Sequence, residues 1–78
     1  MSPEQCRAAR GLLDLTQTDL AAMADVSPGT LRSFEKGQTK PMKNNVSAIR
    51  RALEAAGIEF IGGNRPGVRC AKIKDENQ

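Results

Sequence analysis

The sequence contains no histidine, tryptophan or tyrosine, and it has only two phenylalanines and two cysteines. The lack of histidine removes the commonest general base and the commonest metal ligand from the chain. No glycine-rich phosphate loop, paired-carboxylate motif or cysteine cluster takes its place. We therefore expect no enzymatic activity, no metal site and no cofactor.

The scarcity of aromatic residues means that the core must be thin and built from aliphatic side chains. A chain of 78 residues is one domain, and domains of this size bury only roughly 60% of their unfolded surface. Dimerisation would add buried area and is expected on this ground. The net charge of +3 favours a polyanionic partner, although a protein with a few surplus lysines fits that total equally well.

The two cysteines, Cys6 and Cys70, match no metal-binding or redox spacing. The first residues include no apolar signal region, and no run of 18 apolar residues occurs anywhere. The sequence therefore predicts a cytoplasmic protein with reduced thiols and no membrane contact.

Apolar spacing and capping residues predict four helices. These are Pro3–Leu13, a helix from the Thr16 cap to Asp25, Pro28–Lys36, and a helix from about Asn44 to just before Gly57. Thr16 and Asp19 form a variant of the capping box, and Ser27 caps the third helix. Gly37 ends that helix, and Asp25 tolerates the left-handed conformation that ends the second.

The apolar side chains of each helix are expected to share its buried face. They are Cys6, Ala9, Leu12 and Leu13 in the first helix, Leu20, Met23 and Ala24 in the second, Leu31 and Phe34 in the third, and Val46, Ile49, Leu53 and Ala56 in the fourth. Ala21 is small where a neighbouring helix must approach closely, and Val26 is expected to fill the corner between the second and third helices.

The C-terminal part of the chain changes character after Gly57. Ile58–Ile61 and Val68–Ile73 alternate like short strands around a Gly/Pro-rich turn, which predicts a β-hairpin. We therefore expect a helical domain over residues 1–57, a hairpin over 58–73 that serves as a dimerisation element, and a disordered tail over 74–78.

Only about three residues separate the second and third helices, so the two helices cannot lie antiparallel. A helix, a short turn and a crossing helix form the helix-turn-helix motif, which places its second helix in the DNA major groove. Six basic residues and one acid, Glu35, lie between Arg32 and Arg51. This basic segment is where phosphates would flank an inserted helix. Arg50 and Arg51 are better interpreted as the solvated face of the fourth helix.

The stretch LTQTDLAAMADVSPGTLRSFEKGQTKP resembles the Cro/repressor-type (Xre) helix-turn-helix family. The family pattern reads approximately L-T-Q-x-x-L-A, then G-V-S-x-x-T-I-S-x-x-E-x-G, then P. The resemblance implies a lambda-repressor-like, all-α, four-helix domain with a central helix-turn-helix, here followed by the short hairpin. It also implies a sequence-specific transcriptional regulator, a repressor, that binds double-stranded DNA at a two-fold operator as a homodimer.

The resemblance assigns candidate DNA contacts residue by residue. Base edges would be contacted by Pro28, Gly29, Thr30, Arg32 and Ser33, and phosphates by Gln17, Lys36, Gln38, Thr39, Lys40 and Lys43. Glu35 is structural in such proteins and is not counted as a reader.

Two departures from the family pattern keep a second hypothesis open. Asp25 stands where the family prefers glycine, and Pro28 and Gly29 replace polar residues that often read bases. Direct readout would therefore depend on Arg32, Ser33 and Thr30, with more weight on DNA shape. The alternative is a protein-interaction module, an antitoxin or anti-activator, that keeps the helix-turn-helix as a scaffold and binds a protein partner.

Overall fold

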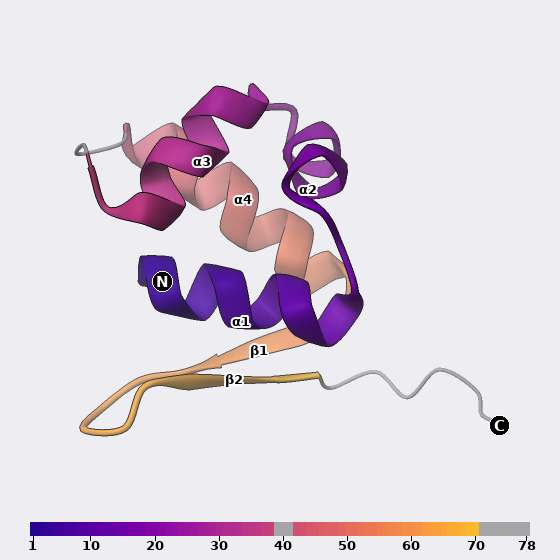
Figure 1. Ribbon diagram of the computed structural model, residues 1–78. Coiled ribbons are helices and arrows are strands. Elements are labelled where there is room, and N and C mark those ends of the chain that lie inside the picture. The colour runs from indigo at the N-terminus through magenta and orange to yellow at the C-terminus, as the bar shows by residue number, and fades with distance from the viewer. Residues whose placement is uncertain (39–41, 71–78) are drawn as a thin grey trace, which may run out of the picture.

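The computed structural model describes residues 1–38 and 42–70. Four helices are followed by a two-stranded antiparallel hairpin (Figure 1). The elements are α1 (Pro3–Leu13), α2 (Gln17–Ala24), α3 (Pro28–Lys36), α4 (Lys43–Ala55), β1 (Ile58–Ile61) and β2 (Gly67–Cys70). The predicted fold class is confirmed. The fourth helix begins one residue earlier than expected, and residues 71–73 of the predicted second strand lie outside the described residues.

Local side-chain chemistry sets the helix starts. Ser2 Oγ accepts the amide of Gln5, and the Gln5 side chain accepts the amide of Ser2, which closes a capping box at α1. Thr16 and Asp19 make the predicted box at α2, with hydrogen bonds of 3.0 and 3.1 Å. These side chains satisfy amides that have no partner within the first helical turn.

The corner between α2 and α3 is formed by Asp25, Val26 and Ser27. Asp25 has a φ of 58°, in the left-handed region, and its amide lies 3.3 Å from the carbonyl oxygen of Ala22. Ser27 Oγ then accepts the amide of Thr30 at 3.1 Å, so that α3 starts at once in a new direction. The predicted corner and its two caps are confirmed.

One aliphatic core joins the helices and one face of the hairpin. Its fully enclosed larger side chains are Leu20, Leu31, Ile49 and Leu53. α1 packs against α3, α4 and β2, while α2 packs against α3 and α4. Ala21 is fully buried, as expected of a small residue at a close helix contact.

The prediction of a buried position is wrong for two residues: Leu12 is 54% exposed and Met23 is 47% exposed. Successive helical residues are separated by about 100° around the axis. The buried face of α1 is centred on Cys6, Ala9 and Leu13, which turns Leu12 toward its edge. In α2 the buried face lies on the side of Ala21, and this rotation takes Met23 out of the core.

The hairpin pairs Ile58 with Cys70 and Phe60 with Val68. Alternation puts these residues on one face of the hairpin, and Glu59 and Arg69 on the other. The inner face packs against the core, and an ion pair joins Glu59 to Arg69 outside. The guanidinium of Arg50 on α4 lies 5.0 Å from the centre of the Phe60 ring, which fastens the hairpin to α4.

Two glycines provide matched tests of this backbone. Gly11 lies inside α1 with open space around a Cβ, whereas Gly37 ends α3 with a φ of 68°. Gly11→Ala is expected to raise the free energy of unfolding by about 0.5–1 kcal/mol, because alanine loses less conformational freedom on entering a helix. Gly37→Ala is expected to lower it by about 1–2 kcal/mol through left-handed strain. Urea denaturation measures both changes, and shifts in the same direction would contradict this assignment of the backbone.

Candidate nucleic-acid interface

Helix α3 has one buried face and one face open to solvent. Leu31, Phe34 and Glu35 are buried, and they hold the helix against the core. The exposed residues are Pro28, Gly29, Arg32 and Lys36, and Thr30 and Ser33 are half-buried at the edges of that face. The predicted base-contacting residues therefore lie along one accessible strip of α3.

The N-terminal end of α3 carries few side chains that could make polar contacts. The hydroxyl of Thr30 lies 2.8 Å from Ser27 Oγ, so it already has a partner within the cap. A Cβ added to Gly29 would meet only Ser27 Oγ, at 4.0 Å, which leaves the strip flat and open at this point. Arg32 and Ser33 remain as the polar side chains of its central part.

A buried carboxylate, Glu35, connects α3 to α1. It is 2% exposed, and Arg10 Nε and Nη2 each donate to it at 2.8 Å. This two-point contact has the fork geometry in which arginine binds a carboxylate most strongly. The Arg7 guanidinium also donates to the backbone carbonyl of Glu35, near the C-terminal end of α3 where carbonyl groups lack helical partners.

The same carboxylate also connects α3 to α2. Gln17 Nε2 donates to Glu35 Oε1 at 3.0 Å. Gln17 is therefore held at the start of α2 by α3, and it is half-buried at that position. Its contact with a DNA phosphate stays a prediction.

A thiol completes the group around Glu35. Cys6 Sγ lies 3.2 Å from Glu35 Oε2 and is the donor to the ionised carboxylate. Burial, followed by the hydrogen bond and charge of Glu35, raises the pKa of the Cys6 thiol to about 12. Cys6 is therefore a free, protonated thiol without the thiolate character that reactivity requires.

Opposing effects act on the carboxyl group of Glu35 itself. Burial raises its pKa, while hydrogen bonds from Arg10, Gln17 and Cys6 and the charge of Arg10 lower it, and the net shift is downward. The hydrogen bond with Glu35 in turn raises the pKa of Arg10, against the effect of burial. Both groups are therefore charged at neutral pH, and the pair is fully formed.

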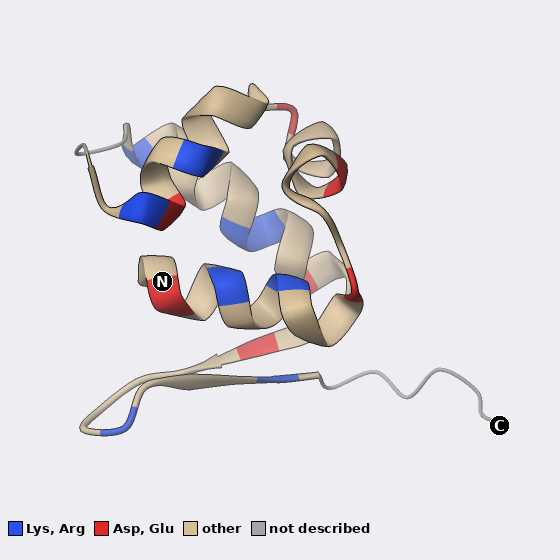
Figure 2. Cartoon of the chain, in the orientation of Figure 1, with Lys and Arg blue, Asp and Glu red and all other residues tan. Residues whose placement is uncertain are grey.

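Charge is distributed unevenly over the two helices of the corner (Figure 2). The charged residues of α2 and of the turns beside it are all acidic: Asp14, Asp19 and Asp25. Helix α3, in contrast, exposes the basic residues Arg32 and Lys36. The other predicted phosphate contacts, Gln38 and Lys43, are exposed at the two ends of the connection to α4. Thr39 and Lys40 lie outside the described residues.

Sequence reasoning did not find Arg7 and Arg10. A signal for them was present, since Glu35 lies four residues after Leu31 and so on the buried side of its helix. A buried carboxylate requires a cation and further donors. The pattern did not show that these donors would come from α1, because that depends on how the helices pack.

Comparison with known protein families agrees with the helix-turn-helix geometry of α2 and α3. A model described as helix-turn-helix matches residues 7–59, a stretch that includes α2, α3 and α4 in full. The chain belongs to the helix-turn-helix family. It is of the Xre/Cro type, which consists of DNA-binding regulators that are not typically enzymes.

A search of curated proteins finds no significant match to this helix-turn-helix protein. Across residues 1–38 and 42–70, no helix is long and apolar enough to cross a membrane. The same ranges contain no group of three or more side chains suited to hold a metal ion.

Removing the charge of Glu35 tests the role of the buried pair. Glu35→Gln is expected to lower the free energy of unfolding by about 2–4 kcal/mol, because Arg10, whose side chain is 20% exposed, loses its counter-charge in a largely buried site. Glu54→Gln is the matched control, since Glu54 forms an ion pair with Arg50 on the surface and both side chains are over 40% exposed. Its expected effect is below about 1 kcal/mol. Equal losses in urea denaturation would show that Glu35 is not a special position.

The raised pKa of the Cys6 thiol predicts that the free energy of unfolding falls at alkaline pH. Its pKa in the folded state lies above the ordinary pKa of a cysteine thiol, about 9, so the folded state retains a proton that the unfolded state releases. The stabilisation is complete below pH 9 and is lost between pH 9 and about 12, with a limiting slope of about 1.4 kcal/mol per pH unit.

The measurement compares wild-type protein with Cys6→Ala by urea denaturation at pH 7, 9 and 10.5. The wild type is expected to lose more stability than the variant above pH 9, since other groups titrate alike in both. Parallel curves for the two proteins would contradict the shift.

Proposed function

We propose that this helix-turn-helix regulator is a sequence-specific transcriptional repressor that binds a two-fold operator as a homodimer, with α3 in the major groove. The observation that carries the proposal is the open strip of α3, whose opposite side is held by Leu31, Phe34 and Glu35. A helix fixed in this way on one side can enter the groove without rearrangement of the domain. The expected place of action is the cytoplasm.

Sequence would be read mainly by Arg32. Its exposed guanidinium can donate two hydrogen bonds to O6 and N7 of a guanine, a contact worth about 1–3 kcal/mol of discrimination. Ser33 and Thr30 would add polar contacts at the edges of the strip. Pro28 offers an apolar surface only, and Gly29 allows close approach of the backbone, so shape and deformability of the DNA carry part of the specificity.

Phosphate contacts would set the orientation of the domain on the duplex. We assign them to Gln17, Lys36, Gln38, Thr39, Lys40 and Lys43. The hydrogen bond between Gln17 and Glu35 supports its assignment, because it pre-orients the amide and so lowers the entropy lost on binding. Contacts of this kind position the protein but do not specify bases.

A homodimer would supply a second copy of α3 to contact the other half of the operator. One α3 reads only a few base pairs, and two domains related by a two-fold axis read half-sites about 34–36 Å apart. With a thin core, the added buried area also stabilises each subunit.

A second candidate is a protein-interaction module that retains the helix-turn-helix as a scaffold. Pro28, Gly29 and the engaged hydroxyl of Thr30 favour it, because they leave few polar readers on α3. The salt dependence of binding separates the two functions. An operator complex with about six phosphate contacts is expected to weaken by about 0.9 log units per contact for each tenfold rise in salt. A tight protein complex without a salt slope, and without a DNA footprint, would favour the scaffold.

Arg32→Ala is expected to relax the preference at one base position in each half-site and to weaken operator binding by about 5- to 100-fold. The matched control is Arg65→Ala, which removes the same charge from the exposed turn of the hairpin. Binding-site selection from random DNA, followed by footprinting and titration of operator and random duplexes, measures both variants. Equal losses on the two duplexes for Arg32→Ala would remove it as a base reader.

A further inference from the structure

Arg7 is an exposed cation on α1 that the proposed operator complex does not yet use. Its guanidinium donates to the backbone carbonyl of Glu35. The peptide bond that carries this oxygen joins Glu35 to Lys36, so the charge of Arg7 lies at the C-terminal end of α3, beside a predicted phosphate contact. Figure 2 shows basic segments on α1 and on the last turn of α3, and these two helices pack against each other. Two helices therefore bring positive charge to one place.

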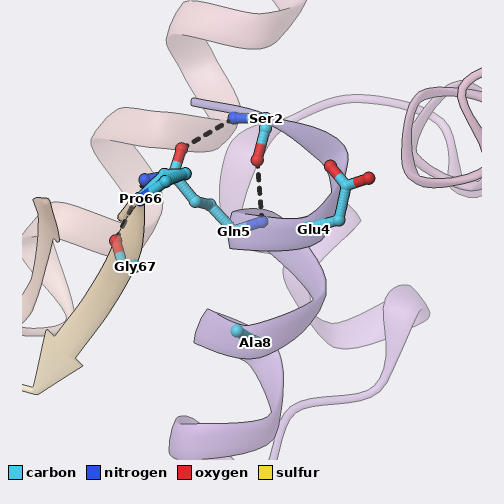
Figure 3. Close-up of a pocket in the computed structure, with 6 residues that line it drawn as sticks. All are labelled: Ser2, Glu4, Gln5, Ala8, Pro66 and Gly67. Atoms are coloured by element: carbon cyan, nitrogen blue, oxygen red, sulfur yellow. Dashed lines mark hydrogen bonds between the residues drawn. The ribbon is translucent and has the colours of Figure 1, made fainter. Parts of the chain in front are cut away.

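The two sides of α1 have different partners. Gln5 points toward the hairpin, where its side-chain amide donates to the carbonyl oxygen of Gly67 (Figure 3). Arg7 follows two residues later, which is about 200° further round the helix. It therefore lies on the side of α1 that is turned away from the hairpin and packs against α3. The rotation of α1 that the Gln5 contacts set thus directs the Arg7 side chain to α3.

The C-terminal end of α3 would be unfavourable for a phosphate without a cation beside it. Carbonyl groups at this end of a helix have no helical partners and give it a partial negative charge. Amides that follow the helix satisfy the carbonyl groups of Ser33 and Phe34, and Arg7 donates to the next one, that of Glu35. Arg7 thus offsets the negative end of the helix dipole at the place where Lys36 is exposed.

The charge of Arg7 is not neutralised by a carboxylate in the part of the chain that the structure describes. The Glu35 carboxylate is bound by Arg10, and the ion pairs among residues 1–38 and 42–70 do not include Arg7. A guanidinium has several N–H groups, and the hydrogen bond to Glu35 uses one nitrogen. The others can bind phosphate oxygens in the two-point geometry that arginine favours.

We propose that Arg7 is a DNA-contacting residue of this protein and binds, together with Lys36, the backbone phosphate that flanks the C-terminal end of α3. The assignment rests on the proposed function, because it adds a contact from α1 to the operator complex formed by α3. The interface then extends beyond the two helices of the motif. The contact acts on every DNA sequence alike, since phosphates carry no base identity.

Arg7→Gln tests the charge, because glutamine still has a side-chain amide that can donate a hydrogen bond. We expect log K for DNA binding to fall less steeply with log salt in this variant, by about 0.9 per half-site. Its loss of affinity relative to the wild type therefore grows about eightfold per half-site for each tenfold fall in salt. Titrations of the selected operator and of a random duplex at several salt concentrations measure the slope, and both duplexes are expected to respond alike.

Arg65→Gln is the matched control. It removes the same charge from the exposed turn of the hairpin, which lies on the other side of α1 from α3 (Figure 1), and its salt slope is expected to equal that of the wild type. Arg7→Lys keeps the charge and is expected to restore most of the slope. A purely structural role of Arg7, as the partner of the Glu35 carbonyl, would lower the free energy of unfolding of Arg7→Gln without changing its slope. That result would overturn the proposal.

Neutral methylphosphonate linkages, placed one at a time in the operator, identify the phosphate. One linkage in each half-site, beside the C-terminal end of α3, is expected to weaken binding of the wild type and of Arg65→Gln. The same linkage is expected to have a much smaller effect on Arg7→Gln, because the phosphate charge has already lost its partner there. Equal sensitivity of Arg7→Gln and the wild type at every linkage would remove Arg7 from the interface.

The wild-type protein separates this inference from the proposed function. A wild-type footprint on the operator, combined with an unchanged salt slope in Arg7→Gln, would leave the proposed function and remove the Arg7 contact. A wild type that protects no duplex would contradict both.

Discussion

The structure depends most on one buried carboxylate, that of Glu35. It receives hydrogen bonds from Arg10 and Cys6 on α1 and from Gln17 on α2, while it belongs to α3 itself. Three helices thus meet at a single charge. A rotation of α1 or α3 would separate that charge from Arg10, and a rotation of α2 would remove the hydrogen bond from Gln17. Separation from Arg10 costs far more than any surface ion pair contributes. In a thin aliphatic core, this polar contact makes the arrangement of the corner specific.

The position of the candidate interface follows from that contact. Glu35 and Leu31 face inward from the same side of α3, so Arg32 is turned to solvent by the helical period alone. The Gln17 amide, held by Glu35, marks the start of α2 beside the open strip. The residues that stabilise the fold and those proposed to contact DNA therefore alternate along one helix. A substitution on the inner side is expected to act on stability, and one on the outer side on binding.

The hairpin is joined to the helical domain by another polar side chain that hydrogen-bonds to several elements at once, that of Gln5. The amide of Gln5 serves two purposes: it closes the capping box of α1 and donates to carbonyl groups at the turn end of the hairpin. A two-stranded hairpin alone is marginal in water. Here Gln5, the contact of Arg50 with Phe60 and the buried face around Ile58 hold the hairpin against the helices.

Sequence alone determined the four helices, the corner with its Ser27 cap and the left-handed Asp25 and Gly37, because each depends on residues that are close together in the chain. It also determined the family, because the motif residues recur at fixed offsets along the chain. It also indicated the outward strip of α3, since helical periodicity separates the two faces. Only the tertiary structure decided that Arg7, Arg10 and Cys6 surround Glu35, that Gln5 holds the hairpin, and that Leu12 and Met23 face solvent. These outcomes depend on the angles at which whole helices pack, and such angles are set by every contact of the core together.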